Sequence, residues 1–139
     1  MDGPGRSRSP FAAAGLLTEC GKGNGLITRV AGTTGTSGSV GDDAAATDAQ
    51  LRSPQALAVT SDGGFLVADT GNQVVRKVSA GGVITRVAGT MGTLGSGGDD
   101  GPATDAQFSG PQDVAMTADG GMLLADTGNH VVRKIAPIP

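Results

Sequence analysis

Short apolar runs alternate with turn-forming residues along most of this chain. Pro54–Thr60, Phe65–Asp69, Val74–Val78 and Val83–Ala88 are rich in β-branched and aliphatic residues, and Gly, Asp and Asn dominate the gaps between them. Runs of this kind, bounded by residues that favour turns, predict antiparallel strands joined by hairpins. No window carries a sustained apolar period of 3.6 residues, so we expect no helices. The pattern therefore predicts an all-β fold of four-stranded antiparallel sheets.

The whole pattern occurs twice. Residues 25–81 recur as residues 82–138 at an offset of 57 residues without a gap, and about 37 of the 57 aligned pairs are identical. The second copy predicts strands over Gln112–Thr117, Met122–Asp126 and Val131–Ile135. Such a period is typical of stacked or radial repeat proteins, in which one unit cannot bury its apolar face alone and the assembled units present a surface.

Polarity changes from the first strand of a unit to the last. The first two strands hold almost only apolar residues, as in Ala56–Val59 and Leu66–Ala68, which is typical of strands covered on both faces. The third and fourth strands carry Arg76, Lys77 and Arg86, so we expect these strands to reach solvent as an ordinary outer surface. A sheet that is buried at its first strand and solvated at its last is what a β-propeller blade requires.

The strings that both copies share are specific. Ala-Asp-Thr-Gly-Asn-x-Val-Val-Arg-Lys stands at residues 68–77 and again at residues 125–134. Together with Pro54 before the first strand and Asp62-Gly63 in the first hairpin, it resembles the NHL repeat, with departures at Ser53, Gly64 and Gly121. The resemblance covers residues 25–136. It implies NHL-type β-propeller blades, usually six to a ring, which serve most often as a binding platform.

The unit is longer than a blade, because a bare blade needs about 40 residues. The excess lies at residues 33–53 and 90–110, where Gly recurs at every third position before an Asp-rich stretch. We expect four segments: residues 1–24, which match the repeat poorly and form a poorly ordered N-terminal segment; 25–53, the fourth strand of a blade plus a long loop; 54–110, a full blade plus a long loop; and 111–139, the first three strands of a second blade.

The turn after the second strand of each copy is the candidate binding site. These turns and the long loops join strands at the same edge, so we expect them to share one face of a propeller. The candidate binding residues are Thr70, Asn72, Gln73, Thr127, Asn129 and His130. Structural turn roles fall to Asp69, Gly71, Asp126 and Gly128. Each carboxylate would accept turn N–H groups, and Asn72 and Asn129 would tolerate left-handed backbone.

The chain offers few groups for catalysis or metal binding. His130 is the only histidine, whereas a hydrolytic triad needs nucleophile, base and orienting group together, and a zinc site wants several His or Cys. Carboxylates that could bind Ca²⁺ are Asp42, Asp43, Asp48, Asp99, Asp100 and Asp105, but their spacing matches no EF-hand loop. We expect turns and a short loop helix at Thr104-Asp105 instead. No catalytic residue, metal site or cofactor is predicted.

Composition argues against a nucleic-acid partner and against a segment that spans a membrane. Net charge is −3, and three Phe with no Trp or Tyr leave little to stack on bases, although Arg76-Lys77 and Arg133-Lys134 could form a basic stripe. No apolar run approaches the roughly 20 residues that span a bilayer. Phe11–Leu17 faintly resembles a short signal segment, so the compartment stays open. Cys20 is alone and allows no intramolecular disulfide.

Two units do not close a ring, because propellers typically have four to eight blades. The order is a fourth strand, a full blade and three further strands, so something else must complete the second blade. Two alternatives stay open. The chain is a fragment of a larger propeller protein, or it forms a head-to-tail homotrimer in which each N-terminal strand completes the neighbour's blade.

The leading interpretation is a non-enzymatic NHL-repeat propeller segment that acts as a scaffold for a protein or ligand, with a protein as the expected partner. One alternative is a fragment of a metal-dependent propeller enzyme of the lyase or lactonase type, for which Asp113 is the one inward polar candidate. The other alternative is an RNA-binding NHL propeller. The sequence identifies no partner, ligand or compartment.

Overall fold

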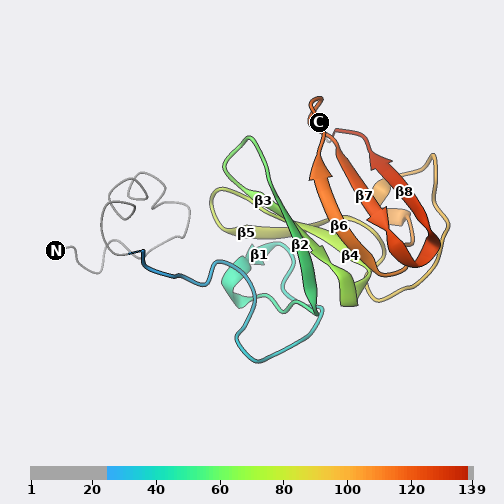
Figure 1. Cartoon of the computed structure of the whole chain (residues 1–139). Coiled ribbons are helices and arrows are strands. Elements are labelled where there is room, and N and C mark those ends of the chain that lie inside the picture. Colours follow the sequence, from blue (N-terminus) through green and yellow to red (C-terminus); the bar gives the residue numbers. More distant parts are fainter. Residues whose placement is uncertain (1–24, 138–139) are drawn as a thin grey trace.

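The computed structural model describes residues 25–137. The N-terminal segment 1–24, with the signal-like run and Cys20, lies outside the described residues, as do residues 138–139. The first sheet has the order β1-β5-β4-β3-β2 and the second the order β6-β7-β8 (Figure 1). Their strands are β1 (Ala44–Ala45), β2 (Pro54–Val59), β3 (Phe65–Asp69), β4 (Val74–Val78), β5 (Val83–Ala88), β6 (Pro111–Met116), β7 (Met122–Asp126) and β8 (Val131–Ile135).

Every strand pair is antiparallel, and the described residues contain no α-helix. Single 3-10 turns occur at η2 (Ala46–Asp48), η3 (Thr70–Asn72), η4 (Ala103–Asp105) and η5 (Thr127–Asn129). The predicted all-β fold of propeller blades is confirmed. Strands β2 to β5 follow one another as a four-stranded blade, and β6 to β8 repeat its first three strands.

A polar turn closes the first hairpin of each blade. Asp62 accepts hydrogen bonds from the Thr60 hydroxyl and from the Gly64 N–H, and Lys77 lies 2.6 Å from its other carboxylate oxygen. These contacts, with Lys77 first, hold the pKa of Asp62 well below its usual value of 3.8. In the second blade, Thr117, Gly121 and Lys134 lower the pKa of Asp119 in the same way.

The hairpin carboxylates predict a modest loss of stability in acid. Their folded pKa is lower than the unfolded value, so their contribution is present above pH 3.8 and is lost as pH falls through the folded pKa. We expect the double variant Asp62→Asn/Asp119→Asn to flatten this part of the stability profile only slightly, since both side chains are more than half exposed. Thermal unfolding midpoints from pH 7 to pH 2 measure it. An unchanged acid slope in the double variant would contradict the assignment.

One core lies between the two sheets. It contains Leu66, Ala68, Val75 and Ala88 from the first sheet, Val114, Met122, Leu124 and Ile135 from the second, and Ala106 and Phe108 from the long segment that joins them. The long segment is therefore not a loose loop, because its apolar side chains fill the space between blades. A second cluster of Ala46, Ala49, Val78 and Ile84 places the preceding long segment on the opposite face of the first sheet.

The innermost strand departs from the expectation that it is covered on both faces. On β2, Leu57 is 66% exposed and Val59 is 80% exposed, while β3 is almost wholly buried. The residues 57 positions later, Val114 and Met116, pack against the first sheet. Leu57 and Val59 are bare because residues 25–137 provide no blade on that side of the first sheet.

The outer face of the second sheet, at the other end of the structure, is also uncovered. Leu123 and Val132 are exposed on the outer face of the second sheet, whereas Leu66 and Val75, 57 positions earlier, are buried between the sheets. We call two residues 57 positions apart counterparts. The two sheets of the chain pack against each other through two faces. Each open face carries the counterparts of the residues on one of those two faces.

Residues 25–30, expected as the fourth strand of a blade, form no strand in the structure. Their counterparts form β5, which pairs with β4 on one side and with β1 on the other. A strand needs a neighbouring edge for its hydrogen bonds. No described strand lies beside residues 25–30, and β8 has no described neighbour on its outer edge.

Candidate binding site

The string that both copies share turns sharply at its Thr-Gly-Asn. The left-handed residue of this turn is Gln73 (φ 64°) in the first blade and His130 (φ 61°) in the second. Asn72 and Asn129, which we expected to tolerate left-handed backbone, each lie one residue before this position. Each asparagine instead ends the 3-10 turn, and its side-chain amide donates to the preceding long segment, at Gly38 O (2.8 Å) and Gly95 O (2.7 Å).

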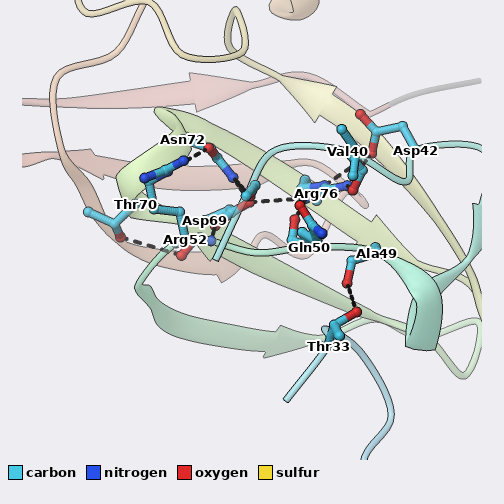
Figure 2. Close-up of polar contacts among 12 residues, drawn as sticks. Thr33, Val40, Asp42, Ala49, Gln50, Arg52, Asp69, Thr70, Asn72 and Arg76 are labelled. Carbon is cyan, nitrogen blue, oxygen red and sulfur yellow. Dashed lines mark hydrogen bonds and ion pairs between the residues drawn. The ribbon is translucent and has the colours of Figure 1, made fainter. Parts of the chain in front are cut away.

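Asp69 is the centre of a buried polar network (Figure 2). Its Oδ1 accepts from the backbone N–H of Arg52 at 2.8 Å. Its Oδ2 accepts from the Asn72 amide at 2.8 Å and from Arg76 Nη1 at 3.2 Å. The donors come from the side chains of the turn, from β4 and from the long segment, rather than from the turn N–H groups that we expected. The network ties the long segment to the blade.

Arg76 is fully buried, which corrects the expectation of a solvated outer strand. Its guanidinium donates to Asp42 Oδ1 at 3.0 Å, to Gln50 O at 2.7 Å and to Val40 O at 3.2 Å, besides Asp69. Burial of a charge is tolerated when it is paired and its hydrogen bonds are made. The neighbouring Lys77 stays half-buried and reaches the hairpin carboxylate instead.

The second blade repeats this network around Arg133. Its guanidinium lies 2.8 Å from Asp99, 3.3 Å from Asp126 and 2.7 Å from Gln107 O, and also stands over the Phe108 ring at 5.1 Å. Arg133 is almost buried, but Asp99 is largely exposed. Sequence reasoning missed the role of both arginines and of Asp42 and Asp99. The available signal was that both Asp and both Arg recur while nearby loop residues differ between the copies.

The Asp-rich segments form no metal cage in the described part of the chain. Asp42 and Asp99 are ion-pair partners of the buried arginines, and Asp43 and Asp100 have positive φ angles of 68° and 69° in turns. Asp48 and Asp105 belong to η2 and η4. No group of three or more potential ligands gathers within residues 25–137. Asp113 is exposed on the outer face of the second sheet.

The turn of the first blade is clamped by the segment that follows it. Gly92 N–H donates to Asn72 O at 2.8 Å, Gly110 N–H donates to Gln73 Oε1 at 2.6 Å, and the Thr70 hydroxyl donates to Pro111 O. Thr70 and Asn72 are consequently buried, while Gln73 is half-buried. These predicted binding residues are engaged inside the chain.

The equivalent turn of the second blade is bare. Thr127, Gly128 and His130 are exposed and Asn129 is half-buried, because residues 25–137 include no segment that follows this turn and covers it. Gly71 and Gly128 each donate their N–H to the preceding segment, at 2.8 Å and 2.7 Å. The predicted site residues therefore divide into a buried first copy and an accessible second copy.

The clamp predicts a large effect of Gly89→Ala. Gly89 has a φ of 91°, and a Cβ there would lie 2.5 Å from Gln73 O and 2.9 Å from the Phe108 ring. The matched control is Gly32→Ala, with a φ of 88° but only the flexible Leu51 side chain at 3.3 Å. We expect Gly32→Ala to cost about 1–2 kcal/mol from backbone strain alone, and Gly89→Ala clearly more. Urea unfolding measures both. Equal losses would contradict the clamp.

A family model described as NHL repeat matches residues 51–77. The chain contains an NHL repeat. The matched range holds β2, β3 and most of β4, with the turn and Arg76. The resemblance to NHL-type propeller blades that the sequence indicated is thereby confirmed.

Curated relatives share part of this NHL-repeat chain. Protein SUPPRESSOR OF QUENCHING 1, chloroplastic, from Arabidopsis thaliana is 31% identical over 94 residues, which is 68% of this chain and 9% of that protein. Teneurin-4 from Homo sapiens is 35% identical over 99 residues, 63% of this chain and 4% of that protein. The chain thus spans less than a tenth of the length of these relatives.

Solved structures share the fold. An auxiliary nutrient binding protein from Bacteroides thetaiotaomicron superposes with a TM-score of 0.64 at 23% identity, over 77% of this chain and 28% of that one. A protein of unknown function from the same organism gives a TM-score of 0.61 at 26% identity, over 66% of this chain and 23% of that one.

Within residues 25–137, no helix has the length and apolar character needed to cross a bilayer.

Two hollows flank the NHL blades. The first, of about 440 Å³, is lined by Arg29, Ala31–Ser37, Leu51 and Pro54. The second, of about 380 Å³, lies between β8 and the long segment, with Gly98–Gly101, Phe108 and Arg133–Pro137 in its wall. In the first blade, the counterpart of the second hollow is filled by β5, which pairs with both β4 and β1.

Proposed function

We propose that this chain is a non-enzymatic protein-binding scaffold built from NHL-repeat propeller blades. One observation carries the proposal: the polar turn that is clamped in the first blade is presented bare in the second, beside an open apolar sheet face. A partner that offers a following segment would find hydrogen-bonding groups and apolar side chains already held in place by the Asp126–Arg133 network.

The carboxylates of the chain support a structural rather than a catalytic use. Asp69 and Asp126 are fully buried against arginines, and Asp62 and Asp119 close hairpins. The basic pairs also support this proposal over RNA binding, because Arg76 and Arg133 face inward and Lys77 and Lys134 are ion-paired. We expect the partner to be a protein. One form of this proposal is a homotrimer, in which three copies of the chain complete a six-bladed ring.

Affinity capture with matched baits tests the scaffold. We expect a protein to be retained by the native chain and by Ser61→Ala, a change in a hairpin turn outside the exposed Thr-Gly-Asn turn and outside the open sheet faces. The same protein should be lost from the double variant Thr127→Ala/His130→Ala, and direct titration of the purified pair should reproduce the loss. Equal retention by all baits would contradict the proposed site. A stoichiometric metal in the purified chain would contradict the non-enzymatic assignment.

A further inference from the structure

We propose that the partner is a second copy of this chain, bound head to tail, with residues 26–31 of one copy completing the β6–β8 blade of the other. The inference rests on the proposed scaffold function and names its partner. Three features of the described chain carry it. They are the two open sheet faces, the second hollow, called here the slot beside β8, and the first hollow, called here the groove at residues 29–37. Each is half of a contact whose other half the same chain displays.

The open faces match because the chain already contains the contact between them. Val114 and Met116 of the second sheet belong to the same core as Leu66 and Val75 of the first sheet. Their counterparts Leu57 and Val59 on one open face, and Leu123 and Val132 on the other, are all exposed. Bringing Leu57 and Val59 of one copy against Leu123 and Val132 of another repeats a packing that the sequence already specifies.

The slot beside β8 lies at the place where the first blade has its fourth strand. Its counterpart is occupied by β5, whose Ile84 is fully buried and pairs with Val78. Residues 26–31 carry nearly the same sequence as β5, yet Ile27, the counterpart of Ile84, is 97% exposed. An exposed strand edge is a ready template for pairing with another chain.

The internal blade also predicts the register of the pairing. Lys77 pairs with Thr85 and Val78 with Ile84. By the same offset, Lys134 of one copy should pair with Thr28 of the other, and Ile135 with Ile27. On the far side of the slot, Asp43 N–H donates to Ile84 O and Ala46 N–H donates to Gly82 O. The counterparts of these two donors are Asp100 and Ala103.

The groove at residues 29–37 receives the bare turn in the same arrangement. In the internal contact, the first turn meets Gly92, Gly110 and Pro111. The counterparts of these three residues are Gly35, Ser53 and Pro54, and two of them line the groove. Thr127 would donate to Pro54 O, and Asn129 O would accept from Gly35 N–H. Strand, turn and sheet face therefore meet in one continuous interface.

The geometry also says what kind of assembly forms. The two surfaces are different patches of the same chain, which makes the contact heterologous, and such contacts close a ring when the rotation allows. In Figure 1 residues 25–32 lie on the opposite side of the molecule from β8, so one copy cannot close on itself. Propellers hold four to eight blades, so closed rings contain two to four copies.

Light scattering coupled to size exclusion tests the association on the purified 139-residue chain. We expect a discrete oligomer at micromolar concentration, with Val132→Asp and Leu57→Asp each weakening association by about tenfold or more. The control is Val40→Asp, an equally exposed apolar residue whose counterpart Gly97 has open space around it. Val40→Asp should associate as the native chain does. A native monomer, or association that survives Val132→Asp unchanged, overturns the proposal.

Disulfide trapping tests the register independently of the size measurement. In a Cys20→Ser background, chains carrying Thr28→Cys are mixed with chains carrying Lys134→Cys and oxidised. We expect a covalent heterodimer, and we expect Thr28→Cys with Ala136→Cys, two residues out of register, to give at most a tenth of that yield. Equal yields from both mixtures, or no heterodimer, overturn the pairing. The native chain could be a monomer by light scattering and still retain a protein through Thr127 and His130 in affinity capture. That result would overturn this inference and leave the scaffold proposal standing.

Discussion

Replacing Arg76 by Met is expected to destabilise the chain by about 3–5 kcal/mol, because removing one partner of a buried ion pair leaves the other charge uncompensated. The stranded group is Asp69, which is fully buried and keeps only the Arg52 N–H and the Asn72 amide. Gln50 O loses its Arg76 donor as well, and Val40 O keeps only the Gln50 N–H. Urea unfolding followed by circular dichroism measures the change.

The second blade provides the control for Arg76. Arg133→Met removes the same interactions at a site where Arg133 touches solvent and Asp99 is largely exposed, so water can replace part of what is lost. We expect about half the destabilisation of Arg76→Met. Arg76→Lys should recover only part of the loss, because an ammonium cannot reproduce the planar fork of donors. Equal losses at positions 76 and 133 would show that burial is not what makes the network matter.

Leu66→Ala is expected to cost about 2–5 kcal/mol, the range for deleting a buried leucine side chain and leaving a cavity. Leu66 is 1% exposed in the core between the sheets. Its counterpart Leu123 has the same side chain at the same place in a blade but is exposed. In dilute monomer, Leu123→Ala should therefore cost less than about 1 kcal/mol, since surface substitutions have small effects.

The two leucines also separate folding from assembly. Measured at concentrations where chains associate, Leu123→Ala should weaken association while Leu66→Ala mainly lowers the unfolding midpoint. Unfolding midpoints at two protein concentrations provide the comparison, because association makes stability depend on concentration. If Leu123→Ala destabilised the monomer as strongly as Leu66→Ala, the outer face of the second sheet would not be open in solution.

Comparison of counterparts shows what a neighbouring blade does to an unchanged sequence. Val75 is fully buried and Val132 is 69% exposed, although both sit in Val-Val-Arg-Lys. Local strand geometry is the same in both copies, since β4 and β8 pair with their preceding strands in the same register. Local sequence therefore sets the strand, and the neighbouring blade sets the burial of one of its faces.

Much of the fold could be predicted from the sequence because local chemistry decides it. The strands at Phe65–Asp69, Val74–Val78 and Val83–Ala88 coincide with the apolar runs, and the turns fall where Gly, Asp and Asn interrupt them. The repeat strings indicated NHL blades. Residues 26–31 show the limit of this reasoning, because they carry a strand sequence without a described strand to pair with.

The candidate site was predictable in position and not in role. The Thr-Gly-Asn turns could be located, but the sequence could not tell that Thr70 and Asn72 are buried while Thr127 is exposed. It also placed Arg76 on a solvated strand, because a charged residue in an outer strand usually faces water. Only the return of the long segment over β4 reveals the buried pairing with Asp42 and Asp69.

The sequence by itself determined the blade: the strand order, the hairpins and the doubled unit follow from periodicity and turn chemistry, which act over a few residues. The tertiary structure alone decided which of two identical strings is covered and where each arginine points. Those outcomes depend on contacts between segments more than 30 residues apart, such as Arg76 with Asp42. Spacing along the chain says which groups exist, and packing in space decides which of them lose their water.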